Sequence, residues 1–128
     1  MRGRAVALAA LVALGASGVS LAKDAAYLGD WTRGDGESKI HVAPCGAKVC
    51  ARNTWVRHGV SGEKVGDRLI LDVRPAGAGR WSGKAFDPQR RRTYTIGVRV
   101  VNAHMTTRGC MMRGLFCESM NWSRTRRS

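Results

Sequence analysis

Acidic residues are scarce in this sequence. It has nine Asp and Glu residues against 22 Lys and Arg residues, which gives a formal net charge of +13 over 128 residues. Such an excess predicts attraction to anionic partners, such as lipid headgroups, lipopolysaccharide, teichoic acids or nucleic acids. An organism with an arginine-rich proteome would produce the same composition without any binding role, so both interpretations stay open.

Aromatic residues are also few, at 6% of the chain. They do not interleave with basic residues in the way that is typical of proteins that read nucleic acids. Trp55 and Trp81 fall in expected strands, where we expect them to belong to the core and not to form stacking platforms. The sequence therefore predicts no sequence-specific binding of nucleic acid.

The common catalytic motifs are missing. His41, His58 and His104 are isolated, with no H-E-x-x-H pattern, so we expect ordinary strand or loop histidines. Gly59-Val60-Ser61-Gly62 only superficially resembles a nucleophile elbow, because no strand and helix flank it. No C-x2-C pair supports a redox role, and nothing selects two carboxylates for glycoside cleavage. We expect no catalytic residue, no cofactor and no metal.

No apolar run is long enough to span a bilayer. The longest, Ala5 to Ala16, follows Arg2 and Arg4 and precedes Ser20-Leu21-Ala22, which has the small residues that a signal peptidase reads. This predicts a signal peptide over residues 1–22 of the general secretory type, since no Arg-Arg pair precedes the apolar run. Removing two arginines from the formal +13 would leave a periplasmic or secreted domain, residues 23–128, with a charge of +11 and no transmembrane segment.

Four cysteines fall in the expected mature chain: Cys45, Cys50, Cys110 and Cys117. In an exported protein an even count predicts two disulfides, for which three pairings are possible. We favour the local pairing, Cys45 with Cys50 and Cys110 with Cys117. Zinc is the competing explanation, but the C-x4-C and C-x6-C spacings are not those of structural zinc sites.

Alternating apolar and polar residues predict short strands separated by turns about every ten residues. The expected strands are 29–33, 39–43, one that ends near Trp55 or Val56, 68–74, 80–86, 93–101, 104–108 and 118–124. No helical periodicity follows the leader. We predict an all-β fold, a closed up-and-down antiparallel barrel of about eight strands. A β-sandwich is the alternative that the same strand count permits.

The two ends of the domain predict how the barrel closes. Gly29-Asp30-Trp31 would begin the first strand, with the glycine allowing close backbone approach and the tryptophan plugging one end. Trp122-Ser123-Arg124 would return beside it. We expect Arg124 to lie across the Trp31 ring as a cation–π contact, which would place any site at the opposite mouth or on the exterior.

An ordered set of short motifs resembles a known family. The set is Gly29-Asp30-Trp31, Pro44-Cys45-Gly46 with Cys50, Trp81-Ser82-Gly83-Lys84-Ala85-Phe86-Asp87-Pro88, Thr93-Tyr94, Arg108-Gly109 and Trp122-Ser123-Arg124. It resembles the bacterial exported family named domain of unknown function 2147. The resemblance implies a small secreted or periplasmic β-barrel, similar to lipocalins, with no established activity. Arg90-Arg91-Arg92 stands where the family has a more neutral turn.

Two groups of residues are candidates for binding. An apolar group near the second cysteine pair would form a rim or lid of the barrel mouth, or else fill a small core: Met105, Met111, Met112, Leu115 and Phe116. Glu118 shares strand parity with Met120 and Trp122, so we expect it to point inward and to be hydrogen-bonded or paired, with an arginine as the natural partner. A second group would form anion-binding patches: Arg90, Arg91, Arg92, Arg124, Arg126 and Arg127.

The sequence therefore predicts a non-enzymatic protein of the bacterial envelope. It would bind a small apolar or amphipathic ligand in the barrel mouth, or an anionic envelope polymer or lipid headgroups on its basic surface. An inhibitor or assembly module that docks another protein through the cysteine-clamped loops is the alternative. A hydrolase with carboxylates that the sequence does not identify is a third interpretation.

Overall fold

The computed structural model describes residues 25–126. The predicted signal peptide, residues 1–22, and Arg127 lie outside the described residues. The described chain forms eight strands: β1 (Gly29–Arg33), β2 (Ser38–Cys45), β3 (Lys48–Val56), β4 (Arg68–Pro75), β5 (Arg80–Asp87), β6 (Arg92–Val101), β7 (His104–Met111) and β8 (Phe116–Arg124). Within this range there is no helix that could cross a membrane.

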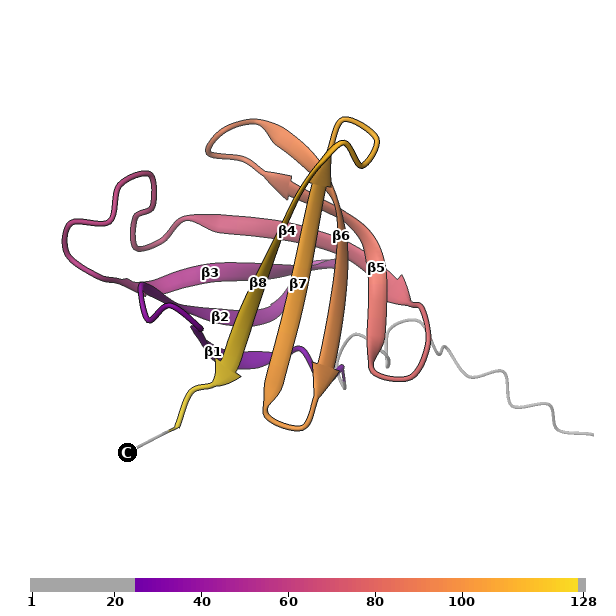
Figure 1. Cartoon of the computed structure of the whole chain (residues 1–128), viewed down its shortest axis with the longest axis horizontal. Helices are drawn as coiled ribbons and strands as arrows, with labels where there is room; N and C mark the ends of the chain where they lie inside the picture. The colour runs from indigo at the N-terminus through magenta and orange to yellow at the C-terminus, as the bar shows by residue number, and fades with distance from the viewer. Residues whose placement is uncertain (1–24, 127–128) are drawn as a thin grey trace, which may run out of the picture.

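Every strand pairs antiparallel with the next one along the chain, and β1 also pairs with β8. The closing register sets Trp31 opposite Arg124 and Arg33 opposite Trp122. The sheet is therefore a closed up-and-down barrel, as predicted, and the β-sandwich alternative is wrong. In Figure 1 strands β1–β4 run across the view, whereas β6–β8 run nearly upright, so the two halves of the barrel cross.

The two ends of the barrel differ in their loops. The connections β1–β2, β3–β4, β5–β6 and β7–β8 lie at one end, which we call the mouth. The remaining three turns and the lead-in, residues 25–28, lie at the other, which we call the closed end. In Figure 1 the long β3–β4 loop lies at the left, and the β7–β8 hairpin lies at the top.

Both disulfides have the predicted local pairing, Cys45 with Cys50 and Cys110 with Cys117. The strands around them are longer than the sequence predicts. β2 continues through Pro44 to Cys45, because Pro44 pairs with Val49 in the ladder and only residues 46–47 turn. Cys110 and Cys117 are direct neighbours across β7 and β8, so this disulfide joins two strands and only residues 112–115 form the loop.

The core follows the predicted alternation along the strands. Its buried apolar residues are Tyr27, Trp31, Ile40, Val42, Val49, Leu71, Ala85, Ile96, Val98, Val100, Met105 and Trp122. Trp81 packs against this core, as expected. The prediction for Trp55 is wrong, because 43% of this side chain is exposed.

A β-bulge explains why Trp55 is outside the core. Residue parity along β3 would put Trp55 on the inner face with Val49 and Ala51. The register shifts where Ile40 pairs with Asn53 but Lys39 pairs with Trp55, so one extra residue of β3 turns Trp55 outward. Its ring then lies 5.7 Å from the ammonium of Lys39 on the outer surface.

Candidate functional site

A cavity of about 380 Å³ occupies the barrel lumen and opens at the mouth. Its walls come from the inward positions of most strands and are mainly apolar: Ile40, Val42, Ala51, Leu69, Leu71, Ile96, Val98 and Met120. Tyr27, Met105 and Trp122 line it more deeply. A space of this size and lining is typical of sites for small ligands, which span about 300–1,000 Å³.

A second hollow of about 350 Å³ continues the lumen toward the β7–β8 hairpin. Tyr94, Met111 and Phe116 line it, and it shares Glu118 and Trp122 with the larger cavity. The lining of the lumen therefore continues to Met111 and Phe116 at the mouth ends of β7 and β8, with Thr107 and Glu118 among its polar members.

The closed end is filled by aromatic rings. Trp31 is fully buried and donates a hydrogen bond from Nε1 to the Tyr27 carbonyl oxygen, at 2.9 Å. The Tyr27 ring meets the edge of Trp81 at a centroid distance of 4.9 Å, and burial raises the pKa of the Tyr27 phenol. The guanidinium of Arg124 lies 4.0 Å from the centroid of Trp31, so the predicted cation–π contact is confirmed.

The structure shows why glycine stands at the first position of the Gly-x-Trp motif, residue 29. Its φ of +114° lies in a region that side chains rarely adopt, and a Cβ there would come within 2.7 Å of Nη1 of Arg124. The Arg124 guanidinium lies in the space that a side chain at residue 29 would fill, and there it donates hydrogen bonds to the carbonyls of Leu28 and, at 2.8 Å, of Ala26. The glycine thus makes room for the arginine that covers Trp31.

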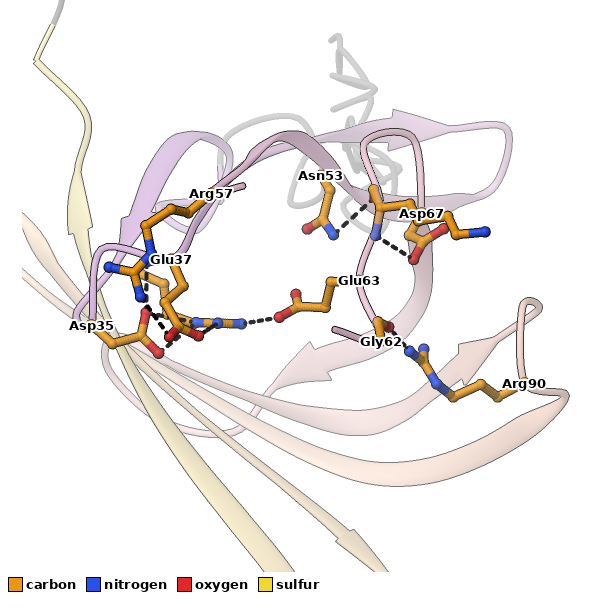
Figure 2. A network of polar contacts seen from close by, with 10 residues as sticks. Asp35, Glu37, Asn53, Arg57, Gly62, Glu63, Asp67 and Arg90 are labelled. Atoms are coloured by element: carbon orange, nitrogen blue, oxygen red, sulfur yellow. Dashed lines mark hydrogen bonds and ion pairs between the residues drawn. The ribbon is translucent and has the colours of Figure 1, made fainter. Parts of the chain in front are cut away.

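The mouth is built around Arg33, whose side chain is 92% buried and faces inward from β1. Its guanidinium binds three carboxylates: Asp35 at 2.9 Å, Glu37 at 3.0 Å and Glu63 at 2.8 Å. Arg57 binds the other oxygen of Glu37 at 2.9 Å. Figure 2 shows these side chains converging from the β1–β2 turn and the β3–β4 loop.

The ion pairs shift the pKa values of the network. Burial alone would lower the pKa of Arg33, but the hydrogen bonds to Asp35 and Glu63 raise it above its usual value. The hydrogen bond from Arg33, followed by one from the backbone N–H of Glu37, lowers the pKa of Asp35. These carboxylates therefore neutralise an inward arginine, and Asp35 does not have the raised pKa of a general acid at neutral pH.

A second network fixes the β5–β6 turn to the start of β4. Burial alone would raise the pKa of Asp87, but hydrogen bonds from the side chain and backbone of Arg90 and from Gln89 lower it overall. The Gln89 amide also accepts from the Arg68 backbone N–H at 3.0 Å and donates to its carbonyl at 2.8 Å. Arg90 reaches further and donates to the carbonyl of Gly62 (Figure 2). The β3–β4 loop is thus held at the mouth from two sides.

The structure divides the predicted apolar group. Met105 is buried in the core, opposite Trp122 in the ladder, so it does not belong to a rim near the second disulfide. Met112 and Leu115 are exposed at the hairpin tip, at 70% and 72%. Met111 and Phe116 lie between tip and lumen.

Glu118 lines both hollows, as its parity predicts. The prediction that an arginine pairs with Glu118 is wrong, because none of the ion pairs within residues 25–126 includes this residue. The side chain is exposed, so solvent can hydrate the carboxylate through the open mouth and no buried counter-charge is needed.

The predicted anion-binding arginines also separate. Arg91 and Arg92 are exposed at the mouth, whereas Arg90 is engaged by Asp87. Arg124 is at the closed end, where it covers Trp31, so it does not join Arg90–Arg92 in one patch. Arg126 follows Arg124 at that end.

The histidines do not form a catalytic group in the described chain. His41 binds Asp30 on the outer surface, with Nδ1 and Oδ1 2.7 Å apart, and His104 is exposed. His58 and Ser61 line one shallow hollow of the β3–β4 loop, but no hydrogen bond joins them among residues 25–126. The same range holds no cluster of three or more His, Cys, Asp or Glu side chains suited to a metal ion.

Sequence reasoning missed Arg33 and the residues around it. Arg33 is two residues after Trp31 on β1, so strand parity already placed it on the inner face. The acidic residues of the following turn were a second signal, since an inward arginine needs carboxylate partners. Glu63 could not be assigned to the mouth without knowing where the long loop lies.

The comparisons with known proteins agree with this architecture. A family described as "Uncharacterized protein conserved in bacteria (DUF2147)" matches residues 29–124, from the glycine of β1 to the arginine that covers Trp31. Among solved structures, a redesigned β-barrel superposes with a TM-score of 0.50 at 13% identity, over 77% of this chain and 91% of that one, which supports the fold alone. None of the curated proteins compared matches the chain. The chain belongs to the DUF2147 family.

Proposed function

We propose that this protein is a non-catalytic binding protein that holds one small, mainly apolar ligand in the barrel lumen. The observation that carries the proposal is the cavity of about 380 Å³ with apolar walls and a polar mouth. A barrel packed solid with side chains would have had no such space. The two disulfides and the bacterial family are consistent with an exported protein, in which an apolar ligand would need a carrier.

The arrangement of polar groups favours an amphipathic ligand. The charged residues that line the cavity lie toward the mouth, and they include Arg68 and Glu118. Arg33, Asp87 and Arg90 are engaged in ion pairs. Their partners balance their charges, so these residues shape the mouth but offer little charge to a ligand. An apolar tail in the lumen with a polar head beside Arg68 and Glu118 would leave no polar group of the ligand unsolvated.

Fluorescence titration with N-phenyl-1-naphthylamine, an apolar probe, tests the proposal. We expect saturable binding of one probe per chain. Ala51 lines the cavity, so Ala51→Phe should fill part of it and weaken binding by about tenfold or more. Ala78→Phe is the matched control, because Ala78 is exposed in the β4–β5 turn at the closed end and its substitution should change nothing. Absence of saturable binding, or equal binding by Ala51→Phe, would overturn the proposal.

A further inference from the structure

The β7–β8 hairpin presents an exposed apolar tip at the mouth. Among residues 25–126, seven large apolar side chains are substantially exposed, and the two most exposed are Met112 and Leu115, with Phe116 at 56% in the same hairpin. Isolated exposed apolar residues are ordinary, but three within five residues at the tip of one projecting loop form a patch.

The backbone of this tip adopts an energetically unfavourable conformation. Met112 and Arg113 have φ values of +53° and +57°, which are unfavourable for residues other than glycine. The turn is closed by hydrogen bonds from Gly114 N–H to Met111 and from Leu115 N–H to Met112, and the Cys110–Cys117 disulfide clamps its base. The apolar side chains are therefore displayed on a stiff loop, which reduces the conformational entropy lost on binding.

Basic side chains flank the tip on the side of the β5–β6 turn. Thr95 of β6 pairs with Cys110 of β7, so the turn that precedes β6 and the hairpin that follows β7 lie at the same end of the barrel. Figure 1 shows both at the top. Arg91 and Arg92 are exposed in that turn, and Arg113 is exposed in the tip itself. Asp87, at the end of β5, is bound by Arg90, and Glu118 in the hollow below the tip offsets only one of these three positive charges.

We propose that the mouth docks on the headgroup region of an anionic lipid bilayer. Met112 and Leu115 would enter the boundary between headgroups and acyl chains, while Arg91, Arg92 and Arg113 contact lipid phosphates. Charge complementarity selects this occupant, because an apolar tip flanked by arginines fits a surface that is apolar inside and anionic outside.

The docked orientation would face the lumen toward the membrane. Phe116 and Met111 line the path from the tip to the inner cavity, with the exposed Glu118 beside them, so a lipid-like ligand could move along a mainly apolar surface. This route alone rests on the proposed function; docking itself does not.

Co-sedimentation with vesicles tests the docking. We expect binding to vesicles of about 30% phosphatidylglycerol in phosphatidylcholine, weak binding to pure phosphatidylcholine, and loss at about 1 M salt, where the Debye length is about 3 Å. The Met112→Ser/Leu115→Ser variant should bind about tenfold or more weakly, because it removes the inserted apolar area. Arg91→Gln/Arg92→Gln should lose about fivefold per arginine.

Matched controls at the closed end make the result specific. Val101→Ser removes an apolar side chain that is 49% exposed, and Arg74→Gln/Arg80→Gln removes two exposed arginines. All three positions lie far along the strands from the mouth, so these variants should bind vesicles like the wild type. Equal losses in the two arginine variants would reduce the effect to net charge, and equal losses in the two serine variants would show that the tip does not insert. Either result would overturn the proposal.

Two further outcomes are distinguishable. Ala51→Phe should lose the lumen probe but keep vesicle binding, so failure of the proposed function and failure of docking give different patterns. Sedimentation velocity reports the alternative occupant: a dimer that Met112→Ser/Leu115→Ser dissociates would make the tip a contact between two copies and overturn membrane docking.

Discussion

Two arginines at opposite ends of the barrel show how much of the positive charge is structural. Arg33 is buried and binds three carboxylates at the mouth, whereas Arg124 lies over Trp31 at the closed end. Both positions belong to the strands that close the barrel, β1 and β8. The positive charge available to partners is therefore smaller than the formal total.

Gly29→Ala tests the close approach at the closed end. The new Cβ would sit 2.7 Å from Nη1 of Arg124, in a backbone conformation with φ of +114°. We expect a loss of about 1–3 kcal/mol in the free energy of unfolding, from strain and from displacement of Arg124. Urea unfolding followed by tryptophan fluorescence measures it.

Gly97→Ala provides the comparison for Gly29. Gly97 lies in β6 with no positive φ, and apart from residues 96–98 no atom of the described chain lies within 4 Å of a Cβ built there. This variant should match the wild type or be slightly more stable, since alanine restricts the unfolded chain. Similar losses at both positions would mean that the contact with Arg124 does not constrain residue 29.

At the scale of elements, the mouth is closed on one side by a loop that makes few apolar contacts. The β3–β4 loop, residues 57–67, is held by the Arg33–Glu63 ion pair and by the hydrogen bond from Arg90 to Gly62. β3 and β4 pair over four residues, Val49 to Arg52, and backbone hydrogen bonds from Asn53 to Asp67 and from Gly66 to Asn53 extend this pairing to the base of the loop. The middle of the loop, around Glu63, therefore depends on its side-chain contacts. Such a segment opens at lower free energy than the strands around it.

Glu63→Gln should loosen this loop without unfolding the barrel. The amide keeps the side chain's size but loses its charge toward Arg33, so we expect faster hydrogen exchange across residues 57–67 and little change in β5–β8. Entry of the lumen probe should also quicken. Lys64→Gln is the control, because Lys64 is exposed and its recorded hydrogen bonds use only its backbone. Unchanged exchange in Glu63→Gln would show that this ion pair does not hold the loop.

At the scale of the whole molecule, the sequence predicted the architecture better than the site. Strand parity and turn spacing are local, and they were enough for eight strands, closure and both disulfides. The Arg33 network joins a turn after β1 to a loop after β3, and a loop's path is not encoded in local periodicity. Trp55 shows the limit of parity itself, since one bulge residue moved it to the other face.

Closure also predicts where the chain can be cut. β1 and β8 are paired, and the Thr125 N–H donates to the Asp30 carbonyl at 2.9 Å, so the two ends of the described chain lie together at the closed end. A linker of about eight Gly and Ser residues, spanning about 15 Å on average, could join Ala25 to Arg126. New ends between Gly77 and Ala78 would then fall in an exposed turn at that same end.

We expect this permutant to fold and to bind the lumen probe like the wild type, because every strand pair and every mouth loop is kept. Chain cuts in exposed turns are generally tolerated. A second permutant with ends between Arg113 and Gly114 should fold as well, held by the Cys110–Cys117 disulfide, but should bind anionic vesicles more weakly since the tip is cut. Circular dichroism, probe titration and vesicle co-sedimentation on both chains separate these results. Loss of probe binding only in the first permutant would place the ligand entrance at the closed end and contradict the orientation argued from Trp31.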